Sequence, residues 1–270
     1  MLKKSLIAAI FALVLAAPAP AAAATVKGVV VAKNPLRKAV VVAAPNGSLR
    51  TVATSAWKST RIGSRVQANA RALQDGTFAA RGFRVTGRVG KARVRAVVVK
   101  YERSSHRYLV SGGGTVFSLR YGGRTLAAAS AEPAQPGAQV VATVDTTSTT
   151  LQTQQLTQVG QVGRLRIEGI ITELSGSTIK LVVPEVGFVT LTVPAGFDLT
   201  KLKVFDQVRA ELGVGADRSF TVLSLKGTRG SIGTGTGSQS GDDDDDDDSG
   251  DDDSDDDDSH DDSNDEDDDD

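Results

Sequence analysis

Residues 26–31 read VKGVVV, and β-branched runs of the same kind return as VRAVVV at residues 94–99 and IEGII at residues 167–171. A second apolar run and a tight turn follow, as in Ala39–Ala43 before Asn46-Gly47. Asn-Gly is a favoured hairpin turn because both residues tolerate positive φ. The body of the chain therefore predicts three copies of one β unit, each opening with a hairpin.

A second recurring pattern lies later in each copy and ends in valine. It reads Gly63-Ser64-Arg65-Val66, then Gly137-Ala138-Gln139-Val140, then Phe205-Asp206-Gln207-Val208. Each pattern leads into a strand, a turn and a last strand, which gives five strands per copy. The spacer before the third pattern, Asp198–Leu202, predicts one helical turn with Asp198 near its N-cap. Five strands with a short helix between the third and the fourth are the layout of the OB-type barrel.

We therefore expect an all-β protein of three tandem, small, five-stranded OB-like barrels, at residues 25–90, 91–163 and 164–230. The hairpin turn of the second copy is the run Gly112-Gly113-Gly114. Trp57, in the spacer of the first copy, is expected to plug the end of its barrel.

The copies resemble the small secreted bacterial OB-like β domains of unknown function that occur in tandem. The resemblance rests on Val26-x-Gly28-x-Val30, on Ile167-x-Gly169-x-Ile171 and on the three patterns ending in valine. The second copy departs from it, because Ala96 replaces the opening glycine and an Ala/Pro-rich insert fills Leu126–Pro136. The resemblance implies a fold and an exported setting, and it transfers no catalytic residue.

Residues 1–24 have the pattern of a signal peptide helix. Lys3 and Lys4 precede the apolar run Leu6–Ala17, and the small residues Ala22–Ala24 follow. We expect cleavage after Ala24 and a mature protein that is secreted or extracytoplasmic. The apolar run is shorter than the roughly 20 residues that a membrane span needs, so no stable span is expected. The chain has no cysteine, which excludes disulfides and Cys-ligated zinc.

The formal net charge of −2 hides a strong segregation of charge. Residues 25–130 hold 20 Lys and Arg against two acids, Asp75 and Glu102, whereas residues 131–241 hold nine of each sign. Residues 242–270 hold 21 Asp, one Glu and no base. Such segregation concerns partners and solubility rather than the fold.

The basic region predicts a surface for polyanions, such as anionic polymers of the cell envelope or the extracellular space. Arginine predominates there, and its planar fork suits phosphate, sulfate and carboxylate groups. Residues i and i+2 of a strand share a face, so Arg93 and Arg95 are expected to lie together. The candidate polyanion-binding residues are Arg81, Arg84, Arg88, Arg93, Arg95, Lys100, Arg103 and Arg107.

Nearby aromatic residues leave a second interpretation open, a secreted OB-type protein that binds single-stranded nucleic acid by stacking and charge. The aromatic residues are Phe78, Phe83, Tyr101, Tyr108, Phe117 and Tyr121. Two barrel cores need about that many rings, so burial of Phe83, Tyr101 and Tyr108 would remove the support for stacking. Sequence-specific readout needs base-edge contacts that no residue pattern identifies, so nucleic acid ranks below other polyanions as a partner.

Catalysis ranks third. The body holds one histidine, His106, beside Ser105 in a polar turn. Adjacent residues on a strand point to opposite faces, which makes a nucleophile–base pair geometrically poor. We expect an exposed turn histidine and a non-catalytic protein.

The C-terminal part consists of a Gly/Ser/Thr linker at 231–241 and an Asp-rich tail at 242–270 that is expected to be disordered. Its spacing partly matches a Ca²⁺ loop but lacks the glutamate of position 12, which indicates weak, multi-site Ca²⁺ binding. The candidate ligands are Asp245, Asp247, Asp251, Asp253 and Asp256. The tail is long enough to reach the basic copies, so it is predicted to mask their surface, with solubility alone as the alternative role.

Overall fold

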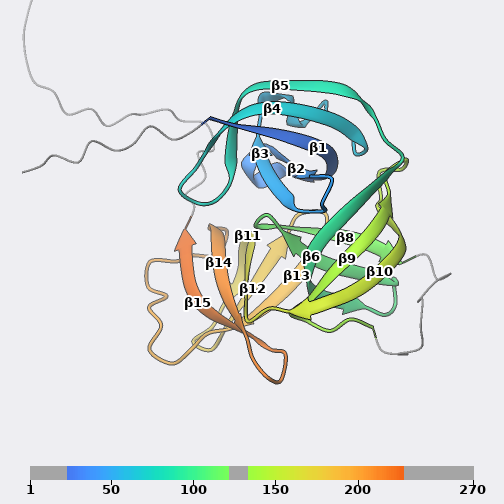
Figure 1. Ribbon diagram of the computed structural model, residues 1–270. Coiled ribbons are helices and arrows are strands. Elements are labelled where there is room, and N and C mark those ends of the chain that lie inside the picture. Colours follow the sequence, from blue (N-terminus) through green and yellow to red (C-terminus); the bar gives the residue numbers. More distant parts are fainter. Residues whose placement is uncertain (1–22, 122–132, 228–270) are drawn as a thin grey trace, which may run out of the picture. The chain divides into compact units, whose positions relative to one another are not determined.

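The computed structural model describes residues 23–121 and 133–227, which belong to one compact unit (Figure 1). Within those two ranges the chain forms three closed barrels of five strands each, and its helical structure is limited to two short 3-10 turns. The prediction of an all-β protein of three tandem OB-like barrels is confirmed. The expected signal peptide helix, the acidic tail with its Ca²⁺-binding candidates and most of the insert lie outside the described residues.

The three barrels follow one another along the chain, from blue through green and yellow to orange in Figure 1. Barrel 1 contains β1 (Ala23–Asn34), β2 (Ala39–Ala43), β3 (Leu49–Ala53), β4 (Ser64–Ala72) and β5 (Phe78–Arg88), with η1 (Pro35–Arg37) and η2 (Ser55–Trp57). Barrel 2 contains β6 (Lys91–Glu102), β7 (Arg107–Gly112), β8 (Thr115–Tyr121), β9 (Ala138–Asp145) and β10 (Gln152–Gln161). Barrel 3 contains β11 (Arg164–Leu174), β12 (Thr178–Val183), β13 (Gly187–Thr192), β14 (Gln207–Val214) and β15 (Phe220–Gly227).

All three barrels share one topology. The first strand pairs antiparallel with the second and the fourth, and the third strand closes the barrel by running parallel to the fifth. Burial alternates along the strands, as on β4, where Val66, Ala68 and Ala70 point into the core of barrel 1. The order 1-2-3-5-4 is that of the OB-type barrel.

The segments between the third and the fourth strand were expected to hold a short helical turn. In barrel 1, η2 forms between β3 and β4, and Trp57 packs half-buried against the barrel core. In barrel 3 no helix is assigned at Asp198–Leu202, but the segment forms one hydrogen-bonded turn, in which the amide nitrogen of Leu202 donates to the carbonyl oxygen of Leu199 at 3.0 Å. The Asp198 carboxylate accepts hydrogen bonds from the amide nitrogen and Oγ1 of Thr200, at 2.9 and 2.6 Å. The bond from the amide nitrogen is the one that an N-cap residue makes, so the expected single turn forms without extending into a helix.

The glycine of the opening motif has a packing role. A Cβ on Gly28 would stand 2.1 Å from the carbonyl oxygen of Ala43, and one on Gly169 would stand 2.9 Å from that of Val182. The first two strands of barrels 1 and 3 therefore approach too closely for any side chain there. β1 itself begins at Ala23, so cleavage after Ala24 would remove its first two residues.

Each first strand carries a β-bulge at the same position, at Val31, Val99 and Thr172. The residue next to the bulge on the second strand is Val41 in barrel 1 and Leu109 in barrel 2. Val31 and Val41 pack into the hydrophobic cluster of barrel 2, and Val99 and Leu109 pack into that of barrel 3. The outer faces of the opening hairpins of barrels 1 and 2 are therefore covered by the next barrel.

Barrel 3 is the last barrel, and its equivalent residues are polar. Thr172 is the bulge residue, and Lys180 is the residue opposite the bulge. Polar residues at these two positions suit an outer face that no further barrel covers in the described part of the chain.

An ionic network joins barrel 1 to barrel 3. Arg37 donates to Asp75 at 2.8 Å and to the buried Glu168, whose side chain is 2% exposed. Arg209 donates to the same oxygen of Asp75 at 3.0 Å. The second oxygen of Glu168 accepts from Nε2 of Gln207 at 2.8 Å. Asp75 thus accepts hydrogen bonds from both arginines, and each oxygen of Glu168 accepts one, so both carboxylates have partners at the contact between the barrels.

The position of Asp75 predicts acid sensitivity. Burial alone would raise its pKa, but hydrogen bonds from Thr77 and Arg37 lower the pKa below its ordinary value of 3.8. The stabilisation is therefore fully present above pH 3.8 and is lost as the pH falls through the lower pKa of the folded state. In urea unfolding from pH 7 to pH 2, the stability difference between wild type and Asp75→Asn should be constant down to about pH 4 and shrink below it. A difference that grows on acidification would contradict this assignment.

Candidate functional site

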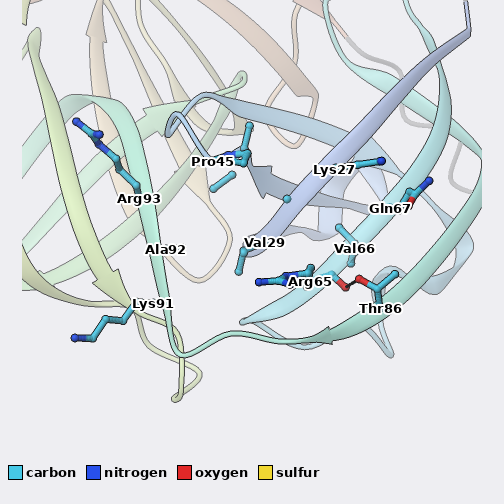
Figure 2. A pocket seen from close by; sticks show the side chains of 13 residues that line it. Lys27, Val29, Pro45, Arg65, Val66, Gln67, Thr86, Lys91, Ala92 and Arg93 are labelled. Atoms are coloured by element: carbon cyan, nitrogen blue, oxygen red, sulfur yellow. Dashed lines mark hydrogen bonds between the residues drawn. The ribbon is translucent and has the colours of Figure 1, made fainter.

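A cavity of about 590 Å³ lies between barrel 1 and the first strand of barrel 2 (Figure 2). Its apolar lining residues include Val29, Ala43, Pro45, Val66 and Ala92. Four bases also line it, and they are Lys27, Arg65, Lys91 and Arg93.

A second cavity of about 400 Å³ adjoins the first and shares Lys27, Ala44 and Gln67 with it. It adds one more base, Arg50. We call the two cavities together the basic groove, which is defined by Lys27, Arg50, Arg65, Lys91 and Arg93.

Strand register explains how the sequence builds this groove. Lys27 on β1 lies opposite Gln67 on β4, which lies opposite Arg84 on β5. Directly opposite residues stand about 5 Å apart, so these three form one row across the outer face of barrel 1. On the facing strand, Lys91, Arg93 and Arg95 are exposed while Ala92 and Val94 are buried. This alternation confirms the prediction that Arg93 and Arg95 share a face.

The side chains divide between the interior and the mouth of the groove. Figure 2 shows Arg65 pointing from β4 toward β6. Lys27, Lys91 and Arg93 extend outward from the two walls. Charged groups therefore surround an apolar floor, and a ligand that reaches all of them must extend beyond the cavity.

The electrostatics of the groove are one-sided. No carboxylate lines either cavity, and none of its five bases forms a salt bridge with the described residues. Lys91 has one acid opposite it, Asp145, whose lowered pKa comes first from hydrogen bonds with Thr147 and only then from Lys91. Like charges held close together repel one another, and a bound anion relieves that repulsion.

The structure brings some predicted site residues into this groove and separates the others. Arg93 lines the groove, Arg84 lies in the row beside it and Arg95 follows Arg93 on the same face. Arg81 and Arg88 are exposed on β5, outside the lining of either cavity.

The last three predicted residues lie elsewhere. Arg107 binds Glu102 through Nε at 3.0 Å and through one Nη at 2.7 Å, and also donates to the carbonyl oxygen of Val186 in barrel 3. Lys100 approaches the same carboxylate at 3.8 Å. Arg103 is exposed in the turn between β6 and β7. Burial alone would raise the pKa of Glu102, but its hydrogen bonds with Arg107 and Ser105 lower it overall.

Four groove residues, Lys27, Arg50, Arg65 and Lys91, were not among the predicted site residues. The alternation that points Lys27, Arg65 and Lys91 away from the barrel cores is visible in the sequence. The contact between barrels that brings β1, β4 and β6 together is not.

The aromatic residues near the bases belong to the barrel cores. Tyr108 is 2% exposed, and its ring centroid lies 4.5 Å from that of Tyr101. Phe117 is buried in the same cluster, and Phe78 and Phe83 pack half-buried against the core of barrel 1. The stacking interpretation therefore loses the rings on which it rested.

Two other aromatic residues are exposed in the described part of the chain, and both belong to barrel 3. Phe188 is 53% exposed on β13, with Nζ of Lys180 5.3 Å from its ring centroid. Phe205 is 81% exposed and has a φ of 75°. It occupies the turn position that holds Gly63 and Gly137, with φ of 82° and 81°, in the other barrels. A phenylalanine at a position where the other two copies have glycine is visible in the sequence, and it could have indicated an exposed ring at Phe205.

The turn with His106 has the expected geometry. His106 is exposed with a φ of 48°, and Ser105 donates to Glu102 at 3.1 Å. Among residues 23–121 and 133–227 no group of three or more His, Asp or Glu side chains could hold a metal ion. The described helical segments are all too short to cross a membrane.

No protein-family model matches the chain, and none of the curated proteins matches it. Among solved structures, the chain is similar to drosophila Unr CSD456, with 13% sequence identity over 77% of this chain and 99% of that chain. The TM-score of this match is 0.19, and at that value the likeness carries no information on fold or ligand.

Proposed function

We propose that this protein is a non-catalytic binding protein of the cell envelope or extracellular space, and that its basic groove holds an anionic polymer. One observation carries the proposal: five bases line two adjoining cavities that no carboxylate lines. A binding surface of this kind gains most of its affinity from charge neutralisation and the release of counterions.

The geometry favours a polymer with regularly spaced phosphate, sulfate or carboxylate groups. Lys27 points away from Lys91 and Arg93, so a ligand that reaches all three must be a chain that extends beyond the cavity (Figure 2). The apolar floor can contact the uncharged units between the anionic groups. Single-stranded nucleic acid is the second candidate, and the burial of Tyr101 and Tyr108 counts against it because base stacking needs exposed rings.

The setting and the role of the tail rest on the sequence alone. Residues 1–24 support export, and the 21 aspartates of residues 242–270 support weak Ca²⁺ binding and masking of the basic groove. Because the tail is itself a polyanion, binding measurements need both the full chain and a chain ending at Gly230. Masking predicts tighter polymer binding by the shortened chain at low salt, and equal binding would refute it.

The proposal predicts a steep salt dependence. With about 0.7 counterions released per contact on a flexible single-chain polymer, five contacts give a slope of about −3.5 in log K against log salt. Affinity should then fall about 100-fold between 50 and 200 mM salt. Titration with a glycerol-phosphate teichoic acid, heparin and oligothymidine, using the chain that ends at Gly230, measures this slope. A slope near zero for all three polymers would contradict the proposed function.

A further inference from the structure

A separate cavity of about 200 Å³ lies where the three barrels meet. Barrel 1 contributes Arg37 and the segment from Asp75 to Thr77, and barrel 2 contributes the turn from Gly113 to Thr115. Barrel 3 contributes Arg166 and Arg209. The cavity shares no lining residue with the basic groove.

The charges around this cavity do not cancel. Asp75 lines it and Glu168 lies next to it, bonded to Arg37, so two carboxylates face three guanidinium groups and one positive charge is in excess. The acceptor sites of Asp75 are filled. Oδ2 of Asp75 accepts from Arg37 and Arg209, and Oδ1 accepts from the amide nitrogen and Oγ1 of Thr77.

The excess charge is that of Arg166. Its side chain is exposed and forms no hydrogen bond or salt bridge within the described residues, whereas its backbone oxygen accepts from Ser111. One of its Nη atoms lies beside Gly76, 3.9 Å from the point where a Cβ would stand. A glycine with a φ of 79° keeps that point free of a side chain. Arg166 therefore lines the cavity together with Arg37 and Arg209.

We infer that this junction binds a small tetrahedral oxyanion, phosphate or sulfate, with Arg166 as its main ligand and Arg37 and Arg209 beside it. Guanidinium groups bind such oxyanions through paired N–H donors. A volume of about 200 Å³ is several times the roughly 30 Å³ that one water occupies, which leaves room for the ion with part of its hydration shell. Because the lining comes from all three barrels, the ion binds the assembled chain and not the separated barrels.

Calorimetric titration of the full chain with inorganic phosphate tests the inference, with chloride at equal ionic strength as the reference. Thermal unfolding follows in parallel: phosphate at about ten times its dissociation constant should raise the melting temperature by about 3–6 °C over chloride. Arg166→Ala should weaken phosphate binding at least about tenfold and reduce the thermal shift to less than about 2 °C. The variant should keep its fold, because the side chain forms no hydrogen bond or salt bridge within the described residues.

Arg164→Ala is the matched control, since Arg164 is exposed on the same strand and does not line the cavity. It should bind phosphate as wild type does. Glycerol 3-phosphate serves as a second probe: binding of both probes indicates that the site accepts a chain-end phosphate, and binding of inorganic phosphate alone indicates a free ion. No phosphate-specific heat or thermal shift in wild type, or equal losses in Arg166→Ala and Arg164→Ala, would overturn the inference. Neither result depends on polymer binding in the basic groove.

Discussion

Arg37→Ala is expected to lower the free energy of unfolding by about 3–5 kcal/mol. Its guanidinium is the link between Asp75 of barrel 1 and Glu168 of barrel 3. Removing it leaves the Glu168 carboxylate, which is 2% exposed, with Gln207 as a neutral partner. A buried charge that loses its counter-charge retains the full cost of its desolvation, which is why the loss exceeds that of a surface ion pair.

Urea unfolding at pH 7 measures this effect, and a double-mutant cycle assigns it. Glu168→Gln removes the charge that Arg37 neutralises, so Arg37→Ala should cost less in the Glu168→Gln background, with a coupling of about 2 kcal/mol. Arg61→Ala, at an exposed residue outside any salt bridge, is the control and should stay within about 0.5 kcal/mol of wild type. A loss below about 1 kcal/mol for Arg37→Ala would contradict the expected cost of leaving the buried Glu168 without its counter-charge.

The sequence predicts the fold well because each copy repeats the same local signals. Asn46-Gly47 closes the first hairpin, with Gly47 at a φ of 85°, and Gly113 and Gly114 close the second. These signals depend only on residues close together in the sequence. A turn recognised in one copy therefore helps to predict the turn at the same place in the next copy. The single turn after Asp198 has the same local origin, because an aspartate can cap a helix or close a turn with the same hydrogen bond.

The sequence also contains a weaker indication of how the barrels pack against one another. Every residue of β2, AVVVA, is buried, whereas burial alternates on the equivalent β12, TIKLVV. A continuous apolar run indicates a strand with both faces covered, and an alternating one indicates a strand with one face in water. The same difference separates Leu109 on β7 from Lys180 at the equivalent position on β12. The apolar residue marks a second strand whose outer face is covered by another barrel.

The candidate site could be predicted only in part. Arg93 and Arg95 follow from strand periodicity, but the groove needs β1 and β4 of one barrel beside β6 of another. Arg107 was a poor choice for a physical reason, since Glu102 is close enough in sequence to bind it across the hairpin. Phe117 and Tyr108 are buried in the core of barrel 2, as the number of rings that two barrel cores need had indicated. The exposed Phe188 and Phe205 lie on barrel 3, where residues 164–230 hold nine bases against seven acids.

The central claim is that the basic groove, and not the overall positive charge, binds anionic polymers. A combined Lys27→Glu, Arg65→Glu and Arg93→Glu variant reverses three of its five charges at exposed side chains. Its affinity for a teichoic acid at 50 mM salt should fall at least about 100-fold, or about 2.7 kcal/mol. With two contacts left, the slope of log K against log salt should change from about −3.5 to about −1.4.

The matched control reverses the same number of exposed charges on barrel 3, with Arg164→Glu, Lys201→Glu and Lys226→Glu. The decisive measurement compares polymer binding by these two variants and wild type, all ending at Gly230, at 50 mM salt. The proposed function predicts a loss of about 100-fold or more for the groove variant and less than about threefold for the control. Equal losses in the two variants would contradict it, because net charge alone would then account for binding.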